Sequence, residues 1–196
     1  MSKSTSVLVA LGVVGGLGVA ALPLSTYADG TPKSNDVGIT LTLDDELQIS
    51  ADKSTTDKVD LSGDSHTGDA TITVTTNNTK GYNLGIKGSA ATNATALTST
   101  TNANDTIAAA AGTVAAPAAF DTAKSEWGYR LATWEADKFA GVTGNNDVIK
   151  TTSVPTTSTG DATVVTFGVS IADGQAAGTY EGQVTFTATN NAVSGS

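Results

Sequence analysis

The segment TITVTTNNTKGYNLGIK, residues 71–87, decides the fold class. Apolar and polar residues alternate on both sides of its centre, and this period of two predicts two strands, because successive side chains of a strand point to opposite faces of a sheet. Between the two runs lies NNTKG, residues 77–81, whose Asn and Gly tolerate positive φ and predict the turn of a β-hairpin. The apolar positions of the two runs are Ile72, Val74, Tyr82, Leu84 and Ile86.

The same alternation recurs along the rest of the chain and predicts about seven strands in all. Thr occupies most of the opposite positions, which suits a solvated strand face because Thr is both β-branched and polar. Strands with one apolar face are typical of antiparallel sheets, and two such sheets packed together form an immunoglobulin-like antiparallel β-sandwich, the fold that we expect. The further strand segments are residues 37–43, 47–49, 127–131, 165–171 and 180–188.

The first residues have the pattern of an export signal. Lys3 precedes an apolar run at 7–22, and the small residues Thr26 and Ala28 stand where a signal peptidase cleaves. An uncleaved membrane anchor is the alternative, because the run approaches the length of about 17 residues that a spanning helix needs.

The remaining segments divide between one domain and its flanks. The Ala- and Thr-rich stretch after residue 88 contains IAAAA at 107–111, a weak candidate for a short helix. We expect a signal peptide at 1–28, a flexible leader at 29–36, a β-sandwich domain at 37–189 with long loops at 89–119 and 141–160, and a disordered tail at 190–196.

Composition excludes several function classes. Nineteen Asp and Glu against ten Lys and Arg give a net charge of −9, which repels nucleic acid. The absence of Cys excludes disulfides, thiolate metal sites and a Cys nucleophile, and the single histidine, His66, stands near no nucleophile motif. We therefore expect a non-enzymatic, secreted or cell-surface protein with no cofactor unless calcium binds.

Calcium is left open because carboxylate and amide oxygens are the ligands that it prefers. The simpler interpretation is that these side chains are solvated turn residues that keep an exported protein soluble. The candidates are Asp44, Asp45, Asn145 and Asp147.

The densest aromatic cluster lies within residues 121–147. Trp127 and Tyr129 share one parity with Leu131, which predicts a core-facing strand, whereas Trp134 falls outside that row. Flat aromatic rings next to polar groups stack on sugars, so the candidate ligand-binding residues are Trp134, Glu135 and Asp137.

Several segments carry a family resemblance. The end of the expected signal peptide at 15–28, the WGY sequence at 127–129 and the closing AGTYEGQVTFTA at 177–188 resemble uncharacterised secreted surface β-sandwich proteins of candidate-phyla bacteria. They are similar, more distantly, to WxL-type cell-wall proteins and fimbrial subunits, although no Trp-x-Leu sequence is present. The resemblance implies a surface module and supplies no catalytic residues.

These observations favour a secreted cell-surface structural or adhesive protein that acts through protein–protein contacts or self-assembly, with no membrane span once the signal is removed. Residues 37–43, which follow the leader and alternate cleanly, are the candidate for β-strand addition to a neighbouring copy. The alternative is a carbohydrate-binding module that uses the cluster at 121–147, with glycans as its partners.

Overall fold

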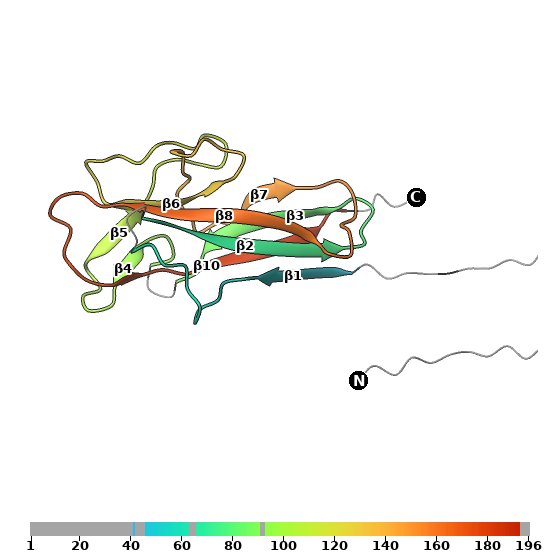
Figure 1. Cartoon of the computed structure of the whole chain (residues 1–196), viewed down its shortest axis with the longest axis horizontal. Coiled ribbons are helices and arrows are strands. Elements are labelled where there is room, and N and C mark those ends of the chain that lie inside the picture. The colour runs from blue at the N-terminus through green and yellow to red at the C-terminus, as the bar shows by residue number, and fades with distance from the viewer. Residues whose placement is uncertain (1–40, 42–45, 63–65, 91–92, 193–196) are drawn as a thin grey trace, which may run out of the picture. The chain divides into compact units, whose positions relative to one another are not determined.

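The computed structural model describes residue 41 and residues 46–62, 66–90 and 93–192, so the predicted segments 1–28 and 29–36, and all of the predicted strand 37–43 except Leu41, lie outside the described residues (Figure 1). All the regular structure in this part of the chain is β, as predicted, and it contains no helix long and apolar enough to cross a membrane. The strands are β1 (Leu47–Ala51), β2 (Thr67–Thr76), β3 (Tyr82–Gly88), β4 (Leu97–Ser99), β5 (Thr106–Ala109), β6 (Glu126–Leu131), β7 (Asp147–Thr151), β8 (Asp161–Ser170), β9 (Tyr180–Glu181) and β10 (Val184–Asn190).

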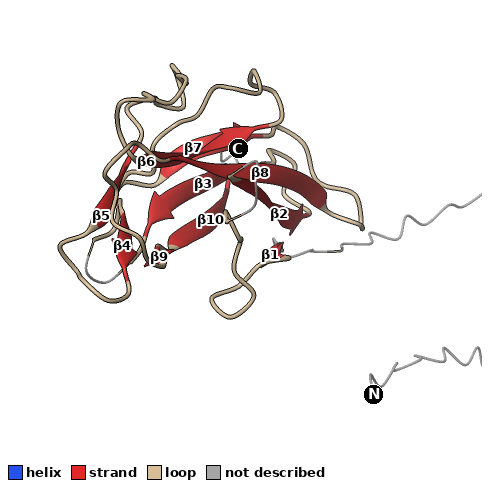
Figure 2. Ribbon diagram, turned by 60° about the vertical axis from the view of Figure 1, so that its left-hand side comes forward, coloured by secondary structure: helices blue, strands red, loops and turns tan. Residues whose placement is uncertain are grey.

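The strands form two sheets of unequal size. One sheet has seven strands in the order β1-β2-β8-β6-β5-β4-β9, and the other has three in the order β10-β3-β7. The paired strands run antiparallel except for β5 and β6, which are parallel. The larger sheet curls into a half-barrel around the smaller one (Figure 2).

The hairpin predicted at 77–81 is wrong, because β2 belongs to the larger sheet and β3 to the smaller one. The turn is held by partners far away in sequence. The buried Asn78 side chain donates to the Asn191 carbonyl at 2.8 Å, and the Thr76 hydroxyl lies 2.8 Å from the Glu46 carbonyl. Gly81 has φ +71, and a Cβ there would collide with Thr152. The Asn and Gly signals therefore marked a real turn, but one that carries the chain from sheet to sheet.

The two sheets share one apolar core, and the predicted alternation is confirmed at its centre. Ile171 departs from the pattern, because it lies beyond the end of β8 and is 47% exposed. Side chains that are almost fully buried come from both sheets: Ile72, Val74, Tyr129 and Val165 from the larger, and Tyr82, Leu84 and Ile86 from the smaller.

Three strands lie inside the segments expected as long loops. β4 and β5 fall within 89–119, and β7 falls within 141–160. The weak helix candidate at 107–111 is instead the end of β5 and the residues after it, where the chain runs beside β6. These strands are short and contain few alternating positions, so the period of two was not visible in the sequence.

Part of the larger sheet is covered on its outer face as well. Gly128 and Gly168 stand opposite each other on β6 and β8, and a Cβ on Gly168 would lie 2.6 Å from the Phe139 ring. Phe139 stacks on Phe120 with ring centroids 4.3 Å apart. Gly168 thus leaves room for this aromatic pair, whose two members precede and follow β6 in the sequence, whereas Gly128 leaves room for the Ala140 carbonyl.

A polar cluster links the two sheets at the side where β7 lies. The Lys150 ammonium on β7 is 2.7 Å from Asp161 Oδ1 on β8, and the Tyr82 hydroxyl donates to Asp161 Oδ2 at 2.9 Å. Burial alone would raise the pKa of Asp161, but the hydrogen bonds from Lys150 and Tyr82 and the charge of Lys150 lower it below its ordinary value. Burial and the Asp161 carboxylate raise the pKa of Tyr82.

Because the pKa of Asp161 is lower in the folded chain, the unfolded chain takes up the proton first as the pH falls through about 4. The cluster therefore stabilises the fold above that pH and loses its contribution below it. We predict that Asp161→Asn lowers the free energy of unfolding by about 1–2 kcal/mol at pH 6 and loses less stability than wild type between pH 6 and pH 3. Urea unfolding at the two pH values measures this.

The exposed carboxylate of Asp173, which has no hydrogen bond or ion pair in the structure, provides the control as Asp173→Asn. An acid-induced loss of stability in Asp161→Asn as large as in wild type and Asp173→Asn would contradict the prediction.

Candidate functional site

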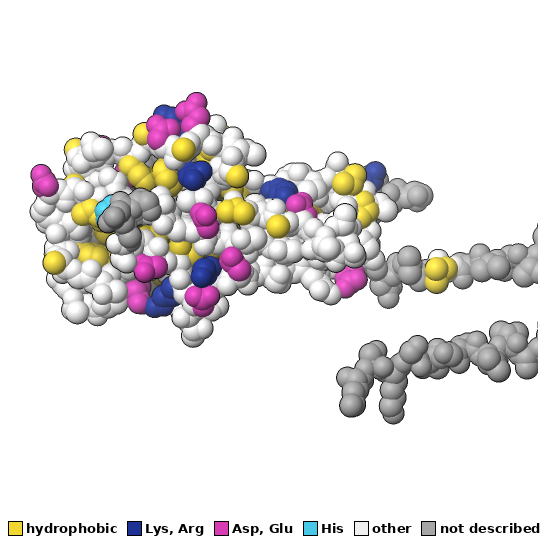
Figure 3. Space-filling model, in the orientation of Figure 1, with side chains coloured by type: hydrophobic (Ala, Val, Ile, Leu, Met, Phe, Trp, Pro, Cys, Tyr) yellow, Lys and Arg dark blue, Asp and Glu magenta, His cyan; other side chains and the backbone are white. Residues whose placement is uncertain are grey.

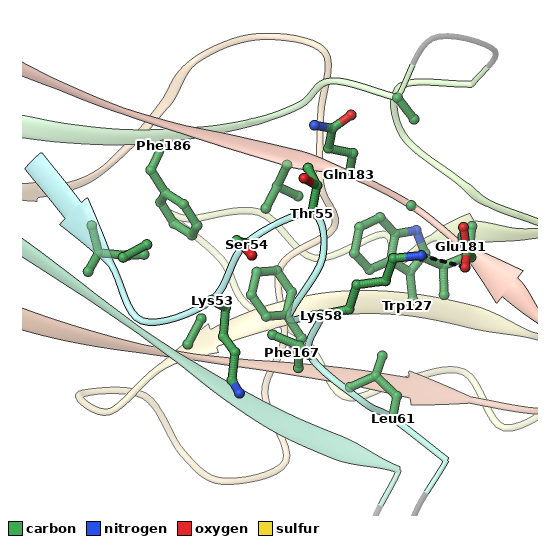
Figure 4. A pocket seen from close by; sticks show the side chains of 18 of the residues that line it. Lys53, Ser54, Thr55, Lys58, Leu61, Trp127, Phe167, Glu181, Gln183 and Phe186 are labelled. Atoms are coloured by element: carbon green, nitrogen blue, oxygen red, sulfur yellow. Dashed lines mark hydrogen bonds and ion pairs between the residues drawn. The ribbon is translucent and has the colours of Figure 1, made fainter.

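A groove of about 670 Å³ opens between the two sheets, on the side where β1 and β10 are neighbours (Figure 4). One wall is β1 with the segment 53–61 that follows it, and the other is the chain from Glu181 to Phe186. The floor is the apolar core itself. Its lining is mainly hydrophobic and includes Ile49, Val59, Leu61, Ile72, Leu97, Trp127, Phe167, Val184 and Phe186.

The groove is open because, in both sheets, the inward-facing side chains of the edge strand are more exposed than those of the strand beside it. On the larger sheet Val74 of β2 is fully buried, whereas Ile49, its partner on β1, is 42% exposed. On the smaller sheet Ile86 of β3 is buried, whereas Phe186, its partner on β10, is only half-buried. The inward-facing rows of two adjacent edge strands therefore remain accessible to solvent.

The floor is aromatic and its polar atoms are already used. The rings of Trp127 and Phe167 stack with centroids 6.4 Å apart, and Trp127 Nε1 donates to the Thr95 carbonyl at 3.0 Å. Figure 4 shows Trp127, Phe167 and Phe186 gathered around the opening. Trp127 and Phe167 are only 4% and 5% exposed, so they offer little surface to a ligand and no free hydrogen-bonding group.

The walls offer backbone groups. In the described part of the chain β1 pairs only with β2, and β10 pairs only with β3. Each is therefore an edge strand, and the edge of a strand presents unpaired N–H and C=O groups that another strand can use. An apolar floor between two such edges matches the main chain and the side chains of an extended polypeptide.

The rim of the groove is charged. Lys58, on the wall segment 53–61, contacts Glu181 of β9 at 2.6 Å (Figure 4), and Lys53 contacts Asp57 at 3.3 Å within the same segment. These are exposed pairs, which contribute at most about 1 kcal/mol each. The ion pair between Lys58 and Glu181 therefore crosses one end of the groove without closing it.

The residues predicted to bind sugars lie elsewhere, since none of them lines the groove. Trp134 is half-buried and its ring packs 6.0 Å from that of Tyr129, while Glu135 and Asp137 are exposed. Trp127, predicted to face the core, does so and is 4% exposed. The structure thus separates the two tryptophans: one forms the groove floor, and the other packs beside Tyr129.

Of the four residues predicted to bind calcium, the structure describes two, Asn145 and Asp147. Asp44 and Asp45 lie outside the described residues. Asp147 accepts a hydrogen bond from the Thr143 hydroxyl at 2.6 Å, and the Asn145 amide donates to the same hydroxyl at 3.1 Å, which describes a self-contained turn. Nowhere among the described residues do three His, Asp or Glu side chains gather as metal ligands would. Calcium binding stays a prediction without a built site.

Two residues that line the groove were not among the core residues predicted from the sequence. Val59 and Leu61 come from a segment that was not predicted as a strand, yet both pack on the core. They stand two positions apart, on either side of Asp60, and this spacing places both side chains on one face of an extended segment. His66, the histidine considered for catalysis, is exposed at φ 50, and its ring nitrogen lies 3.3 Å from the Leu61 carbonyl.

Comparison of the chain with protein-family models, with curated proteins and with solved structures finds no significant match.

We predict that the folded chain binds an apolar dye, anilinonaphthalene sulfonate, in the groove, because the groove is lined mainly by apolar side chains. Ala51 is exposed and lines the groove, so Ala51→Phe fills the opening without disturbing the core. This variant should lose most of the dye fluorescence in a titration at constant protein concentration.

The matched control is Val164→Phe, which adds an aromatic ring at an exposed position of β8 that does not line the groove. Equal dye binding by the two variants would show that the dye, and the accessible apolar surface, lie somewhere else.

Proposed function

We propose that this protein is a secreted or cell-surface structural or adhesive protein that acts by binding other protein chains, and that the groove between β1 and β10 is where it binds them. The signal peptide and the immunoglobulin-like sandwich belong to this proposal. The observation that carries it is the combination of an apolar groove, with Ile49 and Phe186 partly exposed on its walls, and two unpaired strand edges in the described part of the chain.

An extended polypeptide satisfies both parts of the groove at once. Its main chain bonds to a strand edge, and every second side chain enters the apolar floor, which is the mode of β-strand addition. The volume of about 670 Å³ would also suit a small ligand. The polar side chains that line the groove, among them Ser54, Thr55 and Gln183, lie on its walls, and the floor adds no free hydrogen-bonding group.

The rest of the visible surface favours solubility over adhesion. On the face drawn in Figure 3 most side chains are neither hydrophobic nor charged, and acidic and basic groups are interspersed. Such a surface binds little by itself. An apolar groove on such a surface is therefore the part of the molecule that we expect to bind a partner.

The test is cross-linking on intact cells that produce the protein, with an amine-reactive reagent and identification of the linked peptides by mass spectrometry. We expect the protein outside the cell, with Lys53 and Lys58 at the groove rim linked to a protein partner. Lys124, which is exposed and does not line the groove, is the internal control. Ala51→Phe should remove the rim links and leave any links from Lys124 unchanged.

The proposal fails if the protein stays inside the cell, or if the rim lysines remain unlinked to any protein. Binding to a glycan array that is lost in Trp134→Ala but kept in Ala51→Phe would instead favour the carbohydrate-binding alternative.

A further inference from the structure

Resting on the proposed function, we infer that residues 53–60 form a movable strap along the groove, and that the ion pair between Lys58 and Glu181 is the latch that holds it to the opposite wall. The structure shows the closed position, in which the floor residues Trp127 and Phe167 are almost fully buried. When the strap moves away, these two rings become accessible to the partner chain.

Very few polar contacts tie the strap to the rest of the molecule. Its start is fixed by Asp52, whose amide donates to the Thr71 carbonyl at 3.1 Å and whose carboxylate accepts from the Thr71 amide at 2.8 Å. Within 53–60, the latch is the one hydrogen bond or ion pair with any described residue outside 53–62. No strand pairing therefore holds the strap in place.

The contacts inside the strap make it a unit. The Ser54 amide donates to the Asp57 carbonyl at 2.9 Å, and the Ser54 hydroxyl accepts from the Asp57 amide at 3.0 Å. The Lys53 ammonium lies 3.3 Å from Asp57 Oδ1. Because these contacts join residues of the strap to each other, they persist when it moves, and the strap can swing as one body.

Apolar packing favours the closed position. Val59 is half-buried and packs on the core, as does Leu61 just after the strap. The strap lies against Gly68 of β2, where an added Cβ would be 2.6 Å from Val59 Cγ1 and 2.8 Å from the Asp60 carbonyl oxygen. Residues 54–58 are all exposed. With so little apolar surface buried, the strap belongs to the parts of a fold that open locally.

The latch ends beside the aromatic floor. Glu181 precedes Gly182, and a Cβ on Gly182 would lie 3.8 Å from Trp127 Cη2. Figure 4 shows Lys58 reaching from the strap to Glu181 near Trp127. The two paired side chains are 54% and 47% exposed, so water and salt compete with the contact. Breaking it uncovers the groove next to Trp127.

Acrylamide quenching of Trp127 fluorescence measures this opening, because the ring is buried in the closed position. All chains are full length and carry Trp134→Phe, which leaves Trp127 as the only tryptophan. We expect Lys58→Gln and Glu181→Gln each to raise the quenching rate constant by up to about fivefold, the largest change that an exposed ion pair makes to an equilibrium constant. The reversed pair, Lys58→Glu with Glu181→Lys, should restore the parent value.

A further variant opens the strap without changing its charge. Gly68→Ala places a methyl group where Val59 and Asp60 now lie, so it lifts the strap off β2 and should raise the quenching as well. The matched control is Lys124→Gln, which breaks an exposed ion pair with Asp121 outside the groove and should leave the quenching unchanged.

Two outcomes of the quenching experiment would overturn the inference. One is equal quenching in the parent chain and in both latch variants. The other is a rise that the reversed pair leaves in place, because such a rise would come from loosened packing of the core and not from a broken latch.

A locked strap connects the motion to partner binding. The chain has no Cys, so Lys58→Cys and Glu181→Cys can be joined by a bifunctional thiol reagent that a reductant releases. The locked chain is added to the cells used for cross-linking. It should give no links from Lys53 to a protein partner, and release of the linker should restore them.

The two proposals fail separately. Links from Lys53 that persist in the locked chain would leave the proposed function standing and overturn this inference. A strap that opens in the quenching experiment, with no protein linked to Lys53 in either state, would support the strap and overturn the proposed function.

Discussion

A core shared by two sheets of unequal size has to be covered on every side, and in this protein the cover is missing between β1 and β10. The seven-stranded sheet curls around the three-stranded one and buries Ile72, Tyr82 and Tyr129 between them. β1 and β10 are the edge strands on one side, and their inward-facing side chains are partly exposed, whereas the paired side chains on β2 and β3 are buried. The groove is therefore a consequence of how the two sheets meet.

On other sides of the molecule, side chains cover the sheets or join them to each other. Phe120 and Phe139 lie over Gly168 on the outer face of the larger sheet, and the cluster of Lys150, Asp161 and Tyr82 joins the sheets at β7. At the end near the turn 77–81, hydrogen bonds from Thr76 and Asn78 tie that turn to Glu46 and Asn191. Each of these devices uses side chains to close a gap. The segment 53–61 forms one wall of the groove instead, and the exposed ion pair between Lys58 and Glu181 joins it to the opposite wall.

The strongest strands could be predicted from the sequence, because a period of two records which face of a strand is buried. It identified β2, β3, β6, β8 and β10 by their apolar rows. Alternation does not record which strand lies next to which. The alternation of segment 71–87 therefore predicts a hairpin, although its two strands lie in different sheets. Short strands such as β4 were missed because so few positions cannot establish a period. The groove could not be predicted either, since Phe186 alternates like a core residue whether or not a neighbour covers it.

The central claim is that the free edges of β1 and β10 form a binding surface for an added strand. Hydrogen exchange on the full chain, compared between the free chain and the chain bound to the partner that cross-linking identifies, tests it without any substitution. The account predicts that amides within 184–190 exchange more slowly in the bound chain, while amides of β2 and β8, already paired on both sides, do not change. Slower exchange confined to other strands, or none at all in a chain that is nevertheless bound, would contradict it.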